Sequence, residues 1–393
     1  MKVLHVSPGI SPRIGGSAMM ALESGPPLRA MGIETRLFAP NLAVSANAKR
    51  YWTAPRGELA TLPAHARVFR TRRPRRLLFS PSLYSALRRE ASDYDVLHIH
   101  NLWTFPQFAA YRQASRQELP FVVAPCGALD PLRRGRSRRA KALSSALWQG
   151  RMLEEARVIH FKTTLERERA ADLVPFEIGV VVPNGIRWES FQDLPDSAGF
   201  RRRHLQTHEG PVVMTVGRIS WEKRLDVLVR AFAEVADDAP DAVLVIVGPD
   251  DEGLAAPLKR SASDLGIGRR VRFTGPLTGA EKLEALATAD VWCMSSEFEN
   301  FGLAAVEALA AGLPAVISDG VQIANEIGTA GAALVAPCTP QAFAASMRRL
   351  LGDAQLQREL SEQARAFARD FDWASIAPRL ASMYRRAAAG ARR

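Results

Sequence analysis

Residues 295–320 read SSEFENFGLAAVEALAAGLPAVISDG, and a run of apolar residues that ends at Met294 comes directly before them. A polar loop follows that run. Gly302 permits a tight turn into a helix that begins near Leu303, and Gly312 ends that helix before the next apolar run. The segment predicts a strand, a loop, a helix and a second strand, which is the repeating unit of an α/β fold.

The same alternation extends outward along the whole chain. Helical apolar spacing recurs, for example, over 224–236 and 281–288. The predicted strands are 3–6, 35–39, 96–100, 121–124, 158–161, 179–182, 212–216, 242–247, 271–274, 291–294, 315–318 and 333–335. Continuous apolar strands separated by helices indicate parallel sheets covered on both faces. We expect an α/β protein with two Rossmann-like, doubly wound domains that face each other across a cleft.

The alternation is interrupted once, near the middle of the chain, where residues 184–194 read NGIRWESFQDL. A length of 393 residues also suggests two domains, at about 150 residues per domain. We predict an N-terminal domain over 1–195, a C-terminal domain over 196–370 and a terminal helix over 371–393. The apolar positions of that helix predict that it packs against a larger body.

The chain is basic, with 52 Lys and Arg against 41 Asp and Glu and a formal net charge of +11. The excess gathers in Arg67–Arg76 and Arg133–Lys141, two runs that are either a solvated face or a docking surface for an anionic membrane. Neither run belongs to a recognisable nucleic-acid-binding module, so nucleic acid is not expected as a partner.

No apolar run reaches the ~20 residues that a membrane span needs, and the N-terminus lacks a signal-peptide pattern. The three cysteines, Cys126, Cys293 and Cys338, are far apart and indicate neither a metal site nor a disulfide framework. We therefore expect a cytoplasmic protein that associates with the inner face of the plasma membrane peripherally, if at all.

Two carboxylates mark the loop and helix of the opening segment. Glu299 lies in the loop and Glu307 lies inside the helix, so they could grip different parts of one elongated ligand. Carboxylates accept hydrogen bonds from vicinal hydroxyls, as in a sugar or a ribose. The free amides at the helix N-terminus suit phosphate oxygens, and they belong to Phe301, Gly302 and Leu303. The alternative is an ordinary surface acid and an acid on the solvent face of a helix.

A second cluster follows strand 212–216, in the sequence VGRISWEKRLD. Arg218 comes directly after Gly217, and Lys223 begins the next helix. The two cations could converge on a diphosphate and stabilise the charge that develops on it, without a metal ion. The alternative is a surface ion pair with Glu222 or Asp226.

A glycine pair, Gly15 and Gly16, follows the first strand and would let the backbone approach a ligand, or would form a plain turn. The pattern is not G-x-G-x-x-G, and no acidic residue stands at a matching place after the second strand. NAD is therefore not expected as a cofactor.

These motifs together resemble those of the family-4 glycosyltransferases of the GT-B fold. The pattern is R-x4-K followed by E-N-F-G-L-x3-E-A-x-A-x-G-x-P. The resemblance extends over nearly the whole chain and includes the glycine pair, the HIHNLW segment, the VVPNGI turn and the FDW entry to the terminal helix. It implies that this helix crosses back to the first domain.

The resemblance also implies a role for each motif residue. Arg218 and Lys223 would bind the donor diphosphate, Glu299 would contact the transferred sugar, and Glu307 would hold the ribose. Further donor contacts would come from Gly16, Gly217, Phe273, Gly275, Asn300, Phe301, Gly302 and Leu303. The implied reaction is a metal-independent transfer of a hexose from a UDP- or GDP-sugar with retention of configuration, by attack on the face that the diphosphate leaves.

The acceptor side departs from the pattern of the family. Many relatives carry a His or an Arg in the segment that corresponds to Ala124–Ala128, and here Cys126 stands at that place, followed by Gly127. We predict that the acceptor side is lined instead by His98, His100, Asn101, Trp103, Cys126 and Gly127. Alternation along the strand places both histidines on one face, so either could instead be a buried core histidine.

The expected acceptor is a saccharide, free or linked to a polyprenyl pyrophosphate, in envelope or exopolysaccharide assembly. A second hypothesis, from another class, is a protein that binds a nucleotide-sugar without turning it over. The presence of both cations and both carboxylates favours the enzyme.

Overall fold

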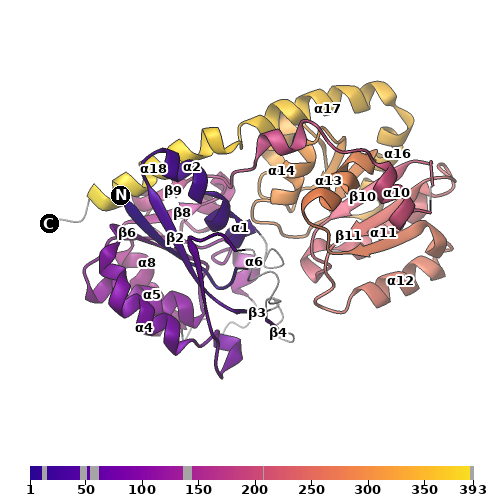
Figure 1. The fold of residues 1–393 in the computed structure, drawn as a ribbon. Coiled ribbons are helices and arrows are strands. Elements are labelled where there is room, and N and C mark those ends of the chain that lie inside the picture. Colours follow the sequence, from indigo (N-terminus) through magenta and orange to yellow (C-terminus); the bar gives the residue numbers. More distant parts are fainter. Residues whose placement is uncertain (11–15, 45–50, 54–61, 136–143, 207, 390–393) are drawn as a thin grey trace. The chain divides into compact units, whose positions relative to one another are not determined.

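The computed structural model describes residues 1–10, 16–44, 51–53, 62–135, 144–206 and 208–389. The chain forms two compact units (Figure 1). The first comprises Met1–Gly185 and Trp373–Arg393, and the second comprises Ile186–Asp372. The boundary predicted at residue 195 therefore lies inside the second unit, because Ile186 and Phe191 are buried in the core of that unit.

The first unit contains a seven-stranded sheet in the order β5-β2-β1-β6-β7-β8-β9, with every neighbouring pair parallel. Its strands are β1 (Lys2–Val6), β2 (Glu34–Pro40), β5 (Ala66–Phe69), β6 (Val96–His100), β7 (Phe121–Ala124), β8 (Val158–Phe161) and β9 (Gly179–Val181). A separate antiparallel pair consists of β3 (Leu42–Val44) and β4 (Tyr51–Thr53).

Strand β5 was not predicted, because its residues were assigned to the first basic run. It lies at the edge of the sheet, where Arg67 reaches solvent and its guanidinium lies 2.9 Å from the Glu90 carboxylate. An edge strand has one neighbour only, so a charged residue is tolerated there and the apolar signal is weak.

Helices cover both faces of the first sheet. One face packs against α4 (Pro81–Glu90), α5 (Phe105–Arg116) and α8 (Gly150–Glu155). The unit also contains the short elements α1 (Gly16–Glu23), α2 (Gly25–Ala30), α6 (Pro131–Arg134), a π-helical turn (Ser145–Gln149) and α9 (Thr164–Arg169), with 3-10 turns at Arg75–Leu77, Ala91–Asp93 and Phe176–Ile178.

The last helix, α18 (Trp373–Ala389), belongs to the first unit, as the resemblance implied. It lies beside α2 and across β6, β7 and β8 (Figure 1). Its buried face includes Ile376, Leu380 and Tyr384. At its start a Cβ added to Gly185 would lie 2.5 Å from the Trp373 ring, so the chain leaves β9 in close contact with the helix.

The second unit contains a six-stranded parallel sheet in the order β12-β11-β10-β13-β14-β15. Its strands are β10 (Val212–Val216), β11 (Val243–Val247), β12 (Val271–Gly275), β13 (Val291–Met294), β14 (Ala315–Ser318) and β15 (Leu334–Ala336). Each lies within a residue or so of its predicted position. The prediction succeeded here because these strands are continuous apolar runs buried on both faces.

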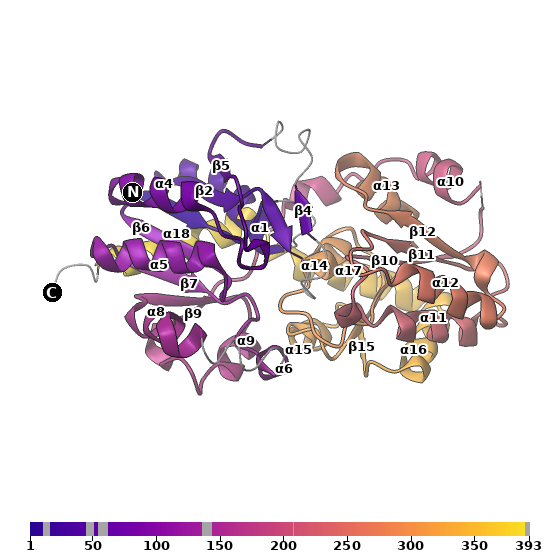
Figure 2. The same ribbon diagram turned by 90° about the horizontal axis from the view of Figure 1, so that it is seen from below.

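Two layers of helices enclose this sheet. Figure 2 shows α11 (Leu225–Val235), α12 (Ala255–Asp264) and α16 (Pro340–Gly352) gathered on one side. The other layer includes α13 (Gly279–Thr288), α14 (Leu303–Ala310), α15 (Ala324–Thr329) and α17 (Ala354–Arg369), while α10 (Ala198–His204) packs beside α13. No helix among the described residues is both long and apolar enough to cross a bilayer.

Each sheet reverses its winding direction once, and ligands of doubly wound sheets bind at such a switch point, outside the carboxyl ends of the strands. In the second unit the reversal falls between β10 and β13, which pair directly. In the first unit it falls between β1 and β6. The loops after these four strands carry most of the predicted site residues.

Candidate active site

The loop after β10 begins with Gly217 and Arg218. The Gly217 amide donates to the Val247 carbonyl at 2.9 Å, so the loop remains tied to β11. The half-buried Arg218 side chain forms no ion pair within the described part of the chain. A cation on such a loop is available to a ligand.

Lys223 and Glu299 form the central ion pair of the site, with Nζ and Oε2 2.5 Å apart. The lysine ends the 3-10 turn η7 (Trp221–Lys223), and the carboxylate lies in the loop after β13. Their side chains are 15% and 26% exposed, so the pair is largely but not fully removed from water. The sequence left open a salt bridge of Lys223 with Glu222 or Asp226. That alternative is wrong, because the Lys223 ammonium pairs with Glu299.

Backbone hydrogen bonds fix the position of Glu299. Its amide donates to the Gly320 carbonyl at 3.1 Å, and its carbonyl accepts from Gln322 at 2.9 Å. A Cβ added to Gly320 would lie 2.4 Å from the Ser296 carbonyl oxygen, so this close approach requires glycine. The carboxylate is therefore presented by a loop that is held along its length.

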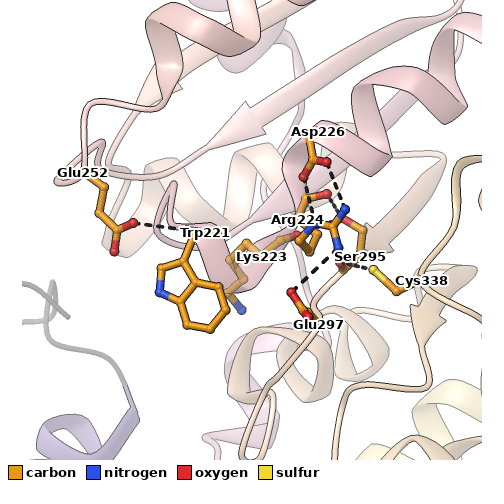
Figure 3. Close-up of polar contacts among 8 residues, drawn as sticks. All are labelled: Trp221, Lys223, Arg224, Asp226, Glu252, Ser295, Glu297 and Cys338. Atoms are coloured by element: carbon orange, nitrogen blue, oxygen red, sulfur yellow. Dashed lines mark hydrogen bonds and ion pairs between the residues drawn. The ribbon is translucent and has the colours of Figure 1, made fainter. Parts of the chain in front are cut away.

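A neighbouring network holds the η7 turn against the ends of β13 and β15 (Figure 3). Arg224, at φ 44°, pairs with Asp226 at 3.0 Å and approaches Glu297 at 3.7 Å. The Ser295 hydroxyl donates to the Lys223 carbonyl at 2.9 Å, and the Cys338 thiol donates to the Ser295 carbonyl at 3.0 Å. These contacts fix the backbone from which Lys223 projects.

The N-terminus of α14 is organised as predicted from Gly302, which has φ 79° and precedes Leu303. The Phe301 ring, in contrast, is buried against Phe371, so only its backbone remains for a ligand. The Asn300 side-chain oxygen is buried and finds no hydrogen-bond partner in the described residues. An unsatisfied acceptor beside this helix start suits a ligand hydroxyl or amide.

Glu307 lies on α14 and pairs with Lys282 of α13, with Oε1 and Nζ 2.7 Å apart. The carboxylate is 18% exposed and the lysine 25%. The sequence analysis did not identify Lys282, because nothing in a helical Lys indicates a partner on another helix.

The remaining donor-side residues lie at the end of β12. Phe273 is half-buried, and the Lys259 ammonium lies 5.2 Å from its ring centre. Gly275 has φ 79°, a conformation that favours glycine, and its carbonyl accepts from the Gly248 amide at 2.9 Å.

In the first unit, Gly16 is the first residue of α1, and Gly15 lies outside the described residues. His98 and His100 are fully buried beneath α18. His98 Nδ1 lies 2.9 Å from the Tyr384 hydroxyl. Both imidazoles therefore belong to the core and line no surface that an acceptor could reach, which corrects the prediction. The alternative of buried core histidines holds.

The two rings belong to a longer chain of hydrogen bonds. His100 Nε2 lies 2.9 Å from His5 Nδ1, and His98 Nε2 lies 3.3 Å from His160 Nδ1. The Tyr384 hydroxyl bridges the two pairs, 3.5 Å from His5 Nε2, and His160 Nε2 donates to a backbone carbonyl at 2.8 Å. A proton on each Nε2 satisfies these five contacts in one direction, from His100 through His5, Tyr384, His98 and His160 to the Val182 carbonyl. Burial lowers the pKa of His5 to about 3, so the chain is neutral.

A metal ion fits this cluster poorly, although the ligand atoms of His5, His98 and His100 lie within 4.8 Å of one another. Two of these atoms already share a proton, which a metal ion would have to displace. The Lys162 ammonium, buried and 3.0 Å from His160 Nε2, would also repel a cation.

The acceptor-side loops have unusual backbones. Asn101 and Trp103 have φ 68° and Cys126 has φ 54°, conformations that L-residues adopt at a cost. Glu166 holds the Cys126 loop, because its carboxylate accepts from the Gly127 amide at 2.6 Å and from the Lys162 amide at 2.7 Å.

Cys126 is not an activated nucleophile. Burial raises the pKa of its thiol to about 11, so the thiol is protonated at neutral pH. Glu166 was missed, although the T-x-x-E spacing could have marked a helix start: the Thr163 hydroxyl caps α9 by accepting from the Glu166 amide at 2.9 Å.

Comparisons with known proteins agree with this geometry. The family model for Glycosyl transferases group 1 matches residues 196–367, and the model for the Glycosyl transferase 4-like domain matches residues 15–185. The D-inositol 3-phosphate glycosyltransferase of Frankia alni is 30% identical over 98% of each chain. That of Kineococcus radiotolerans is 30% identical over 78% of this chain and 74% of its own.

Solved structures show the same fold. The Anabaena protein Alr3699/HepE, in complex with UDP and glucose, superposes with a TM-score of 0.78 at 20% identity, over 97% of this chain and 98% of its own. Sucrose-phosphate synthase from Thermosynechococcus elongatus gives 0.76 at 19% identity, over 99% of each chain. Fold and matches together define a glycosyltransferase with the GT-B fold. The chain belongs to the family-4 glycosyltransferases.

Proposed function

We propose that this glycosyltransferase transfers a hexose from a UDP- or GDP-hexose to a saccharide acceptor, with retention of configuration and release of the nucleoside diphosphate. The observation that carries the proposal is the meeting of Lys223 and Glu299 at the switch point of the second unit, beside the Arg218 loop. Lys223 would be the cation for the departing diphosphate, and Glu299 would be the carboxylate for the sugar hydroxyls. The two groups are hydrogen-bonded to each other.

The donor would bind the second unit. Arg218 offers a planar fork to the diphosphate and Lys223 a point charge, so the charge that develops on the leaving group is neutralised by side chains. The Asn300 oxygen and the amides of Gly302 and Leu303 would contact donor oxygens or hydroxyls, with Phe273 and Gly275 nearer the base. The step then needs no metal ion.

In the front-face mechanism that the family resemblance implies, a departing phosphate oxygen accepts the proton of the acceptor hydroxyl. That oxygen takes the place of a protein base, and no protein nucleophile is required. The high pKa of Cys126 agrees with this, since the thiol near the acceptor-side loops is not ionised.

The acceptor would bind the first unit, near the strained loops at Asn101, Trp103, Cys126 and Gly127. A lipid-linked acceptor, such as a polyprenyl pyrophosphate, agrees with the surface of this unit. Arg73, Arg75 and Arg76 are exposed there, and Leu77 beside them is 51% exposed. Exposed apolar and cationic side chains together suit the inner face of an anionic membrane.

The test is a thermal-shift panel of nucleoside diphosphates and nucleotide-sugars, with and without EDTA. A ligand at a hundred times its dissociation constant adds about 2.7 kcal/mol to the free energy of unfolding. We expect UDP or GDP to raise the melting temperature equally in both buffers. No response to any nucleoside diphosphate would overturn the proposal, and a response that EDTA abolishes would overturn metal independence.

Turnover separates the enzyme from a protein that only senses a nucleotide-sugar. Purified protein, incubated with the stabilising donor and a bacterial lipid or oligosaccharide extract, should release the nucleoside diphosphate and label a product. Binding without release or labelling would favour the sensor.

A further inference from the structure

The two carboxylates of the donor site are each held by a lysine from a different element. Glu299 meets Lys223 at 2.5 Å, and Glu307 meets Lys282 at 2.7 Å. The first lysine follows β10, whereas Lys282 lies near the start of α13. Exposed fractions of 15–26% set both pairs apart from ordinary surface salt bridges, which are more exposed and contribute little.

No acidic residue lies three or four positions from Lys282, the spacing at which side chains on one helix meet. The positions three and four residues away are Thr278, Gly279, Ala285 and Leu286. The two acids of α13, Glu281 and Glu284, pair with Arg203 instead. The Lys282 ammonium therefore finds its carboxylate partner across the helix pair, in Glu307.

Both helices contribute buried residues to one core cluster. Leu286 and Ala285 of α13 are buried in one cluster with Ala305 and Ala308 of α14. Both neighbours of Glu307, Val306 and Ala308, are fully buried, whereas the Glu307 side chain itself is 18% exposed. The lysine occupies one carboxylate oxygen, Oε1, and leaves acceptor capacity on Oε2.

We propose that Lys282 is a positioning residue for Glu307 and thereby sets the selectivity of the site for the ribose hydroxyls of its donor. The inference rests on the proposed function, in which the second unit binds a nucleoside diphosphate. Lys282 orients the carboxylate so that Oε2 accepts from a ribose hydroxyl. Its positive charge also offsets the repulsion between that carboxylate and the diphosphate that Arg218 and Lys223 bind.

The experiment measures the affinity for UDP, 2′-deoxy-UDP and 3′-deoxy-UDP by calorimetry, with GDP and its deoxy forms in parallel. Wild-type protein should prefer the ribonucleotide by on the order of tenfold, the value of one hydrogen bond to a charged group. In Lys282→Met we expect the affinity for the ribonucleotide to fall by about tenfold. The ratio of its affinity to that of the deoxy forms should then approach one. Lys282→Arg should retain most of both.

A cycle with Glu307→Gln tests whether the lysine acts through this carboxylate. In the Glu307→Gln background, Lys282→Met should change the affinity by less than about twofold. Arg203→Met is the matched control, since it removes the other ion pairs of α13 and should leave the preference unchanged. Circular dichroism and melting curves establish that each variant is folded.

Two kinds of result would overturn the inference, and only the second would also overturn the proposed function. An equal loss for the ribonucleotide and both deoxy forms, or an undiminished effect of Lys282→Met in the Glu307→Gln background, would make Lys282 a structural residue and leave the proposed function intact. Failure of the wild-type protein to bind UDP or GDP would overturn the proposed function, and this inference with it.

Discussion

At the level of single residues, the ion pair between Lys223 and Glu299 is the most specific feature of the site. Each group neutralises the other while no donor is bound, so neither charge is left partly buried and alone. A donor would exchange this contact for two others, because the ammonium would meet the diphosphate and the carboxylate would meet the sugar.

We predict that Lys223→Ala and Glu299→Ala each reduce turnover on the order of a hundredfold or more, as for the loss of one group that stabilises a transition-state charge. Both proteins should remain folded, because the loops are held by backbone contacts. Initial rates of nucleoside diphosphate release would measure the effect. Asp238→Ala, which removes an exposed ion pair with Arg348, is the control and should retain full activity. Full activity in both site variants would mean that the site lies elsewhere.

At the level of the elements, the site depends on how closely β10 and β11 approach at their carboxyl ends. A Cβ added to Gly248 would lie 1.8 Å from the Gly217 carbonyl oxygen and 3.4 Å from the Arg218 amide nitrogen. Both are backbone atoms, which cannot rotate away as the end of a side chain can. Gly248 therefore supports the Arg218 loop although it was not among the predicted site residues.

Gly248→Ala should lower the free energy of unfolding by about 1–3 kcal/mol, the usual cost of forcing extra volume into a packed region. It should also weaken UDP binding, because the loop that carries Arg218 must shift. Urea unfolding and calorimetry would measure the two effects. Gly352→Ala is the matched control, since a Cβ there meets no atom within 4 Å. Equal behaviour of the two variants would contradict the role of the close approach.

At the level of the whole molecule, the terminal helix is bound to the first sheet through neutral histidines. Burial lowers the pKa of His5 to about 3 and holds the pKa values of His98, His100 and His160 well below their usual range. In the unfolded chain these imidazoles titrate near pH 6.5 (about the model-peptide value), so the unfolded chain binds more protons below that pH.

The stabilising effect of these lowered pKa values is complete above about pH 6.5 and is lost as the pH falls toward 3. Each imidazole that is protonated only in the unfolded chain lowers the free energy of unfolding by about 1.4 kcal/mol per pH unit. We therefore predict that the urea midpoint falls steeply between pH 6.5 and 4.5, while proton uptake accompanies unfolding. A urea midpoint that stays constant over this range would contradict the conclusion that these histidines are neutral in the folded protein.

Much of this organisation follows from local sequence. The parallel strands of the second unit are continuous apolar runs, and glycines such as Gly302 mark the turns at which Glu299 and the α14 amides are presented. Strand and turn preferences depend on a few neighbouring residues, and a small set of connection rules restricts the order of strands in such folds. The motif residues could therefore be located before any coordinates were known.

Contacts between distant segments could not be found in that way. Lys282 meets Glu307, Glu166 meets the Gly127 amide, and Tyr384 meets His98 across 286 positions of the chain. A lysine or histidine has the same local signature whether it faces solvent or a partner on another element. Burial and hydrogen-bond satisfaction arise only when the sheets and helices pack, so the tertiary structure alone distinguishes a core histidine from an acceptor-side one.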